Sequence, residues 1–173
     1  MSTVSTPELE ILDIVDDQDR VIGSGSRQYI HENKLNHRSV HVLLFRSNGD
    51  LFLQKRAQWK DNCPGLWESS VSGHVDKGES YVQCAIREID EEVGVSVPLH
   101  LEWLMKIDAE EKYGYEFATV YKVIYDGAVF PDPREIEDSM WLTPVLVDQS
   151  IKRDPKRYTN SFLAIWSHIR NKK

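Results

Sequence analysis

The stretch GHVDKGESYVQCAIREIDEEVGV, residues Gly73–Val95, decides the fold because it joins a glycine-containing loop to a long helix-forming segment. From Glu79 to Val93 the residues are good helix formers without proline or internal glycine, and Gly94 stands where a C-terminal cap belongs. An α-helix has about 3.6 residues per turn, so this segment carries one apolar stripe that we expect to pack on the core. The stripe consists of Val82, Ala85, Ile86, Ile89 and Val93.

Three glutamates form a second face of this predicted helix. Glu88, Glu91 and Glu92 stand at i, i+3 and i+4, and residues at these spacings are neighbours on a helix surface. Their carboxylates repel one another unless a cation lies among them, and Mg²⁺ prefers such oxygen ligands while it bridges to substrate phosphates. A solvated acidic face is the common alternative, but the flanking residues favour a platform for Mg²⁺ and a diphosphate, with Mn²⁺ as the alternative ion.

Every defined position of the spacing G-x5-E-x7-R-E-U-x-E-E-x-G-U is filled in this stretch, where U is a bulky aliphatic residue. The matching residues are Gly73, Glu79, Arg87, Glu88, Ile89, Glu91, Glu92, Gly94 and Val95. This spacing resembles the box of the Nudix hydrolases. The resemblance implies an α/β/α sandwich of the α+β class, in which helices flank a mixed β-sheet, and a Mg²⁺-dependent enzyme that cleaves a diphosphate linkage.

Outside the box, strand-like segments alternate with turn residues. We predict one domain over residues 9–173, after a flexible segment over residues 1–8. The expected strands cover residues 10–15, 20–23, 37–45, 51–56, 67–71, 99–109, 115–125 and 137–142. The expected further helices cover residues 27–33, a short segment that begins at Pro144, and residues 158–170.

Length and composition limit the classes of function. At 173 residues the chain suits one domain with a sizeable core. The net charge of −7 argues against nucleic acid as a partner, because no basic surplus exists to neutralise phosphates. Cys63 and Cys84 match no metal-ligand spacing, and we expect free thiols. The sequence shows no signal peptide and no long apolar segment, so we expect a cytoplasmic protein without a membrane partner.

A narrower resemblance covers most of the first two-thirds of the chain. The strings PGLWESSVSGHVDKGES (Pro64–Ser80) and LDIVDDQDRVIG (Leu12–Gly23) are similar to type I isopentenyl-diphosphate isomerases. Those are Nudix-fold enzymes that move a double bond by protonation and deprotonation. In that family a cysteine directly precedes the first glycine of the box, and here this position is Ser72. The resemblance therefore implies that the family's catalytic thiol is missing.

The same resemblance implies a second metal site built from histidine and glutamate. His37 and His74 match ligand positions of the isomerases, and His31 matches another after a one-residue shift. Glu116 matches a glutamate that both catalyses and ligates. Gly114 stands where the family has a neighbouring glutamate, so one metal ligand is also missing.

The predicted reaction follows from these differences. Isomerisation needs an acid and a base on opposite faces of the alkene, and a serine hydroxyl is much weaker in either role than a thiol, whose pKa is about 8.5. Because the box glutamates are complete, we predict hydrolysis by attack of water on phosphorus. An isopentenyl-diphosphate isomerase activity and a non-catalytic diphosphate-binding module are the alternatives. The small-molecule substrate stays unidentified, and the isomerase resemblance implies that a homodimer can form.

Catalytic and metal-binding roles fall on acidic residues. Glu91 or Glu92 is the expected general base, with Glu116 as the outside candidate, and the sequence does not rank them. The expected metal ligands are Glu88, Glu91, Glu92 and, as a further contact, Glu79.

Other residues of the box are expected to be structural or to touch substrate. Arg87 is expected to pair with Glu79 and brace the loop against the helix. Gly73 is expected to let the backbone turn tightly and approach the substrate, and Gly94 to cap the helix. The candidates for substrate contacts are His37, Arg56, Trp67 and His74. For each of them a packed, hydrogen-bonded or solvated role is the alternative.

Overall fold

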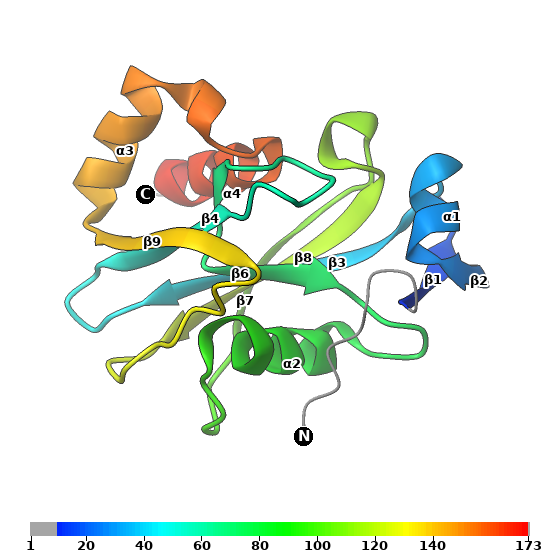
Figure 1. The fold of residues 1–173 in the computed structure, drawn as a ribbon, viewed down its shortest axis with the longest axis horizontal. Coiled ribbons are helices and arrows are strands. Elements are labelled where there is room, and N and C mark those ends of the chain that lie inside the picture. Colours follow the sequence, from blue (N-terminus) through cyan, green and yellow to red (C-terminus); the bar gives the residue numbers. More distant parts are fainter. Residues whose placement is uncertain (1–9, 173) are drawn as a thin grey trace.

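The structure is a computed structural model that describes residues 10–172, and it arranges them as a mixed sheet between helices (Figure 1). The predicted α/β/α sandwich is confirmed. The flexible segment predicted for residues 1–8 lies outside the described residues.

The elements follow the predicted order. The strands are β1 (Ile11–Val15), β2 (Val21–Ser26), β3 (His37–Phe45), β4 (Leu51–Arg56), β5 (Trp67–Glu68), β6 (Val71–His74), β7 (Glu102–Ile107), β8 (Glu116–Ile124) and β9 (Ile136–Leu142). The helices are α1 (Arg27–Glu32), α2 (Tyr81–Val93), α3 (Pro144–Arg153) and α4 (Asn160–Asn171).

The strand predicted over residues 67–71 is in fact two short strands, β5 and β6. The interruption comes from Ser70, whose buried hydroxyl accepts a hydrogen bond from the Leu44 backbone N–H (2.7 Å) and donates one to the Phe52 carbonyl (2.5 Å). A serine side chain thus replaces ladder hydrogen bonds where β3 and β4 separate. The separation leaves room for side chains between the two parts of the sheet.

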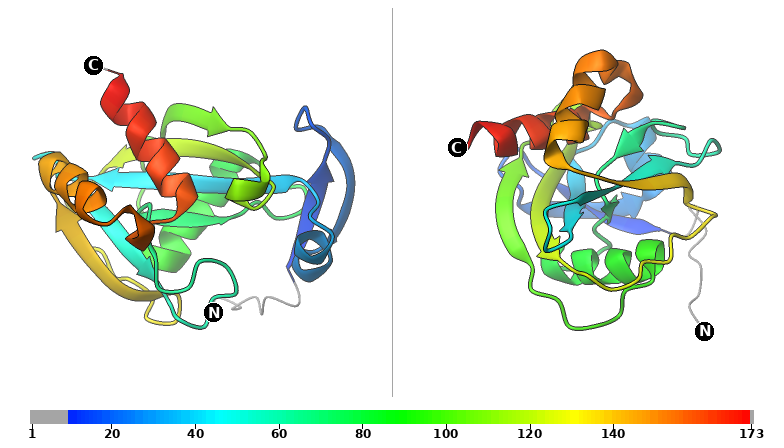
Figure 2. Two further views of the ribbon diagram at one scale, coloured as in Figure 1. Left: turned by 90° about the horizontal axis from the view of Figure 1, so that it is seen from above. Right: turned by 90° about the vertical axis from the view of Figure 1, so that its left-hand side faces the viewer.

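The sheet is organised around a parallel pair. Its order is β5-β4-β3-β8-β7, while β6 pairs with β3 and β9 pairs with β4. β3 and β8 run parallel over their whole lengths, and the other pairings are antiparallel. β1 and β2 form a separate hairpin that lies with α1 at one end of the molecule (Figure 2).

Helices cover both faces of this sheet. α2 lies on one face, and α3 and α4 lie on the other (Figures 1 and 2). Alternation along β3 supplies both cores, because Val42 packs in the cluster under α2 and Leu43 packs in the cluster under α4. α2 begins with a capping box, in which the Ser80 hydroxyl and the Gln83 side chain each bond the other's backbone N–H. It ends at Gly94, whose φ of 66° suits glycine.

The apolar stripe predicted for α2 is partly wrong. Val82 and Ile86 are 45% and 55% exposed, whereas Glu88 and Glu92 lie on the buried face. The helix is rotated about its axis so that Glu88 lies against Gly73 and Glu92 bonds the Ser72 N–H and the buried Gln54. Trp59 and Trp103 are also exposed (58% and 60%).

Candidate active site

β6 forms a wall shared by two clusters of polar side chains. Its register places His74 opposite Ser39, Gly73 opposite Val40 and Ser72 opposite His41 of β3. Successive residues of a strand point to opposite faces. Ser72 and His74 therefore share the face of the β3 histidines, while Gly73 faces α2.

The first cluster contains the helix carboxylates, with Arg87 at its centre. Arg87 donates to both oxygens of Glu79 (2.9 Å each), so the predicted ion pair is confirmed. Its Nη1 also lies 2.7 Å from Glu88 Oε1 and 3.3 Å from Glu91 Oε2. A further bond from Nη2 to the His74 carbonyl, 3.0 Å long, ties the helix to β6.

Gly73 permits the close approach of Glu88. A Cβ on residue 73 would lie 2.1 Å from both Cδ and Oε1 of Glu88, far inside van der Waals contact. The Gly73 backbone has no positive φ, so space and not conformation is what requires glycine at this position. The structural role predicted for the first glycine of the box thereby has a physical reason.

Glu92 contacts Ser72, the residue before Gly73 on the same strand. Its Oε2 accepts from the Ser72 backbone N–H at 3.0 Å and from Gln54 Nε2 at 2.9 Å. Burial, together with the neighbouring charge of Glu88, holds the pKa of Glu92 well above its ordinary value. Burial likewise raises the pKa of Glu88 to about 7, although Arg87 opposes the shift.

The donor set of this first cluster fits a hard divalent cation. Glu88 and Glu92 are buried, Glu91 is half-exposed, and all offer carboxylate oxygens. Neither hydrogen-bond partner of Glu92 in the described part of the chain is cationic. Burial is the largest cause of the raised pKa of both Glu88 and Glu92, so a bound cation would stabilise their charged forms. Glu79, by contrast, has both oxygens engaged by Arg87.

The second cluster, which we call the His/Glu centre, consists of His31, His37, His74 and Glu116. One ligand atom from each of them lies within 4.8 Å of every other. The parallel register places His37 directly beside Glu116, and the ring centroids of the three histidines are 4.9–5.1 Å apart. Glu116 Oε1 lies 3.3 Å from His74 Nε2 and 3.7 Å from His37 Nε2.

Two buried nitrogen atoms in the His/Glu centre lack a partner. Within residues 10–172, Nε2 of His31 and Nε2 of His37 are buried and make no hydrogen bond. An unpaired buried polar atom is costly, and imidazole nitrogen beside a carboxylate is a donor set for a transition-metal ion. The residues therefore fit the second metal site that the isomerase resemblance implied.

In the His/Glu centre, the histidines and the carboxylates shift one another's pKa values. Burial lowers the pKa of His74, but hydrogen bonds to Glu10 and Glu116 outweigh burial and raise the pKa to about 9. Burial raises the pKa of Glu116, yet the neighbouring imidazoles of His37 and His74 hold that pKa well below the ordinary value. The structure thus pairs the Glu116 carboxylate with His74 where a bound metal ion would bring positive charge.

A third group of polar residues adjoins Ser72. The Ser72 hydroxyl donates to Glu68 Oε1 at 3.1 Å, and Arg56 Nη1 lies 2.8 Å from the same oxygen. Burial lowers the pKa of Arg56, but Glu68 outweighs this effect and the pKa is raised. Arg56 lies beside this group and is paired with Glu68, and its predicted contact with substrate stays a prediction. Trp67 is 3% exposed within the core under α4, which supports the packing alternative for this residue.

Sequence reasoning missed Gln54, Glu68 and Glu10. Gln54 shares a face of β4 with buried Phe52, so a polar residue at a core position was the available signal. Glu68 lies within the quoted loop string and was passed over. Glu10 precedes β1 and touches His74 Nδ1 at 3.4 Å, a contact across the fold that no local pattern reveals.

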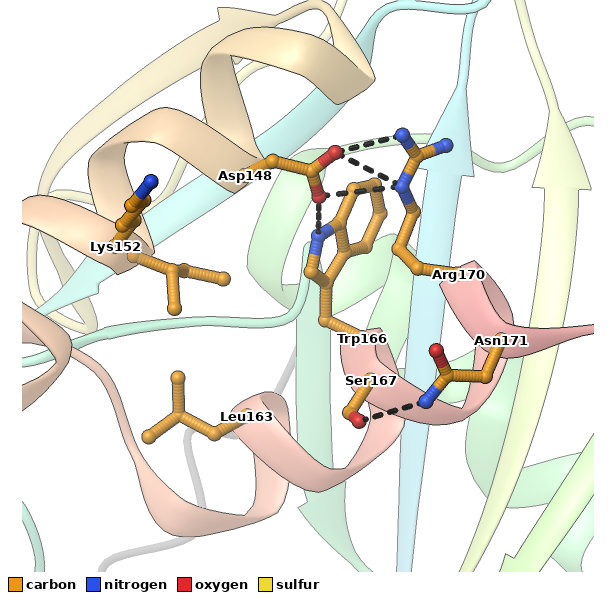
Figure 3. A pocket seen from close by; sticks show the side chains of 8 residues that line it. Asp148, Lys152, Leu163, Trp166, Ser167, Arg170 and Asn171 are labelled. Carbon is orange, nitrogen blue, oxygen red and sulfur yellow. Dashed lines mark hydrogen bonds and ion pairs between the residues drawn. The ribbon is translucent and has the colours of Figure 1, made fainter.

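A pocket between α3 and α4 shares no residue with these clusters (Figure 3). There Asp148 accepts hydrogen bonds from Trp166 Nε1 at 2.8 Å and from Arg170 Nη2 at 2.6 Å. These contacts join α3 to α4, so we assign them a structural role.

The comparison with protein families agrees with this geometry. A model of the NUDIX domain matches residues 35–162. The chain belongs to the Nudix family. The matched residues include β3, the box and α2 as well as Glu116, so both clusters lie largely inside the family domain.

Relatives of this Nudix protein carry two kinds of name. The isopentenyl-diphosphate Delta-isomerase of Serratia proteamaculans is 33% identical over 92% of this chain and 91% of that protein. An uncharacterised Nudix hydrolase of Streptomyces coelicolor is 38% identical over 73% of this chain and 71% of that protein. A crystal structure from Deinococcus radiodurans is 28% identical, with a TM-score of 0.73, and covers 84% of this chain and 90% of that one.

In residues 10–172, every helix is too short or too polar to cross a bilayer.

Proposed function

We propose that this Nudix protein is a divalent-metal-dependent hydrolase that cleaves a diphosphate linkage in a small organic substrate, such as a nucleoside diphosphate joined to another group. The observation that carries the proposal is the buried carboxylate pair, Glu88 and Glu92, which flanks Ser72–Gly73 and in which neither hydrogen-bond partner of Glu92 within residues 10–172 is cationic. Membership of the Nudix family supports it.

The residues divide the work as follows. Glu88, Glu91 and Glu92 would hold Mg²⁺, or Mn²⁺ in its place, and such an ion neutralises phosphate oxygens and acidifies the attacking water when bound. Glu91 is half-exposed and bonded only weakly to Arg87, so it is free to accept the proton of water. Glu92 has both the Ser72 amide and Gln54 on one oxygen, which fixes its orientation. Glu116 stays the outside candidate for the base.

The His/Glu centre belongs to the same proposal as a second metal site. His31, His37, His74 and Glu116 would hold a transition-metal ion, which supplies charge to bind the substrate's phosphates. Positive charge from such an ion would complement that of Arg56, which the structure already pairs with Glu68.

A metal-dependent hydrolysis screen tests the proposal. The purified protein with Mg²⁺ or Mn²⁺ should release phosphate or a monophosphate from some member of a panel of nucleoside diphosphate derivatives, nucleoside triphosphates and prenyl diphosphates. Chelation should abolish the release. If no member of the panel is turned over under any of these metal conditions, the assignment as a hydrolase fails.

An isopentenyl-diphosphate isomerase is the second candidate, favoured by the His/Glu centre and the 33% identical Serratia relative, although Gly114 stands where the isomerases have a further ligand. Against it stands Ser72, whose hydroxyl donates to Glu68 and which replaces a thiol of pKa about 8.5 with a far weaker acid. Incubation with isopentenyl diphosphate and a search for dimethylallyl diphosphate separate the two candidates.

The biological setting is also part of this proposal. The net charge of −7 supports a small-molecule substrate and argues against a nucleic-acid partner. Homodimer formation and a cytoplasmic location stay predictions from the sequence.

A further inference from the structure

The three histidines of the His/Glu centre share one arrangement. In each ring Nε2 points toward the centre, while Nδ1 meets a partner outside it. In proteins the second ring nitrogen of a metal-bound histidine commonly donates to an outer carboxylate, carbonyl or amide, which fixes the tautomer and aims the ring. The outer partners here come from three different segments.

His37 and His74 have acceptors at Nδ1. The Leu35 carbonyl oxygen lies 2.9 Å from His37 Nδ1, and the Glu10 carboxylate lies 3.4 Å from His74 Nδ1. An N–H at Nδ1 that donates to these oxygens leaves Nε2 with its lone pair free. Glu10 thus gives His74 a carboxylate on the side away from Glu116.

His31 has a carboxamide at Nδ1. The amide of Asn62 lies 3.1 Å from this nitrogen. Rotation of a carboxamide by half a turn places its oxygen where its NH₂ group stood, so Asn62 is able to accept from an Nδ1–H of His31. Nε2 of His31, which is buried and unpartnered within residues 10–172, is then free for an ion.

Arg27 lies between Glu10 and the segment that contains Asn62, the two residues that contribute side chains as outer partners. It forms a bidentate pair with Asp61 (2.7 and 2.8 Å), the residue before Asn62, and its Nε lies 3.7 Å from Glu10 Oε2. The Arg27 backbone N–H also donates to the Glu10 carbonyl at 2.9 Å. Arg27 therefore contacts Glu10 directly and is linked to Asn62 through the adjacent Asp61.

We propose that Glu10 and Asn62 are positioning residues for a transition-metal ion at the His/Glu centre: they hold Nδ1 of His74 and His31 and so aim both Nε2 atoms at the ion. This inference rests on the second metal site of the proposed function. It adds two residues outside the matched ligand positions, and Glu10 lies outside the stretch that the family model covers.

Co²⁺ binding to the metal-stripped protein tests the inference, because its visible absorption reports how many imidazoles are bound and in what geometry. The variants are Glu10→Ala, Asn62→Ala and the conservative pair Glu10→Gln and Asn62→Asp, whose side-chain oxygens are still able to accept from Nδ1–H. Glu102→Ala and Asn48→Ala are the matched controls, since among residues 10–172 the side chain of Glu102 pairs with Lys122 and that of Asn48 bonds to Asp50. Affinity is measured by competition with a chelating dye, and circular dichroism with a denaturant midpoint checks folding.

Loss of an outer partner typically weakens metal binding about 10- to 100-fold. We expect that loss for Glu10→Ala and Asn62→Ala, with an altered Co²⁺ spectrum at saturation, while the conservative variants and the controls stay close to wild type. Folded alanine variants with wild-type affinity and spectrum would overturn the inference, as would a wild-type protein that binds no Co²⁺ through its histidines. Failure of the hydrolase assignment is separate, because it is measured as Mg²⁺-dependent turnover without Co²⁺.

Discussion

At the scale of single residues, Gly73 is where the backbone of β6 and the carboxylate of Glu88 come closest. We expect Gly73→Ala to destabilise the protein by about 1–3 kcal/mol, because the new methyl group would overlap Glu88 and force it aside. The displaced carboxylate should also weaken Mg²⁺ binding.

Urea unfolding and Mg²⁺ titration of Gly73→Ala check both effects. Gly23→Ala is the matched control, since a Cβ there meets only Ile14 at 3.9 Å. A Gly73→Ala protein as stable as the control variant would contradict the close approach of Glu88.

The helix carboxylates give the second prediction at this scale. Glu88→Gln and Glu92→Gln should each lower kcat for the accepted substrate at least about 100-fold, the scale at which metal ligands and general bases act. Glu91→Gln should do the same if Glu91 is the base. Steady-state kinetics at saturating Mg²⁺ measure the change, and Glu102→Gln on β7 serves as the control. Wild-type turnover by both Glu91→Gln and Glu92→Gln would refute the roles assigned to them.

At the scale of elements, the capping box decides where α2 begins and hence where its glutamates lie. Removing the Ser80 hydroxyl should cost about 1 kcal/mol, because it leaves the Gln83 N–H without its acceptor. Thr143→Ala removes the equivalent cap of α3. We expect both variants to lose similar stability in denaturant unfolding, but only Ser80→Ala to lose Mg²⁺ affinity. Equal Mg²⁺ affinity in the two variants would show that the start of α2 does not govern the site.

The elements also show what sequence could and could not predict. Most strands and helices follow from alternation, turn residues and caps, and β3 and β4 match their predicted bounds. The rotation of α2 about its axis does not follow from these patterns. Val82 and Ile86 look like core residues until the contacts of Glu88 and Glu92 with β6 are known. The motif spacing located Glu88, Glu91 and Glu92, and the isomerase resemblance located His31 and Glu116. Glu10 and Asn62 escaped both, since their contacts depend on how the β1–β2 hairpin and the loop after β4 fold back on the histidines.

At the scale of the whole molecule, the shifted pKa values of buried groups make the free energy of unfolding depend on pH. The pKa of Glu88 rises from 4.5 to about 7 on folding, and that of His74 rises from 6.5 to about 9. The folded state therefore binds more protons than the unfolded state in this range, so stability is greatest at the acid end and is lost as pH rises through these values. The metal-free protein should unfold at lower urea concentration at pH 9 than at pH 6.5.

Two additions separate the contributing groups. Mg²⁺ should flatten the part of the pH profile near 7 that belongs to Glu88, and Glu88→Gln should remove that part without Mg²⁺. The pKa of His31 is lowered to about 4, so this residue makes stability fall as the pH drops below 6.5. The comparison is therefore restricted to the range from pH 6.5 to pH 9. A free energy of unfolding that rises between pH 6.5 and pH 9 would contradict the raised pKa values of Glu88 and His74.

The parallel pairing of β3 with β8 determines when the His/Glu centre is completed in the nascent chain. The loop that this pairing closes contains the entire box, so the closure is long-range and is entropically harder than any hairpin in the sheet. His31, His37, His74 and the helix glutamates leave the ribosome before Glu116 and β8, because synthesis runs from the N-terminus. An ion that meets the nascent chain then finds three imidazoles without their carboxylate. Completion of the His/Glu centre therefore coincides with closure of the sheet.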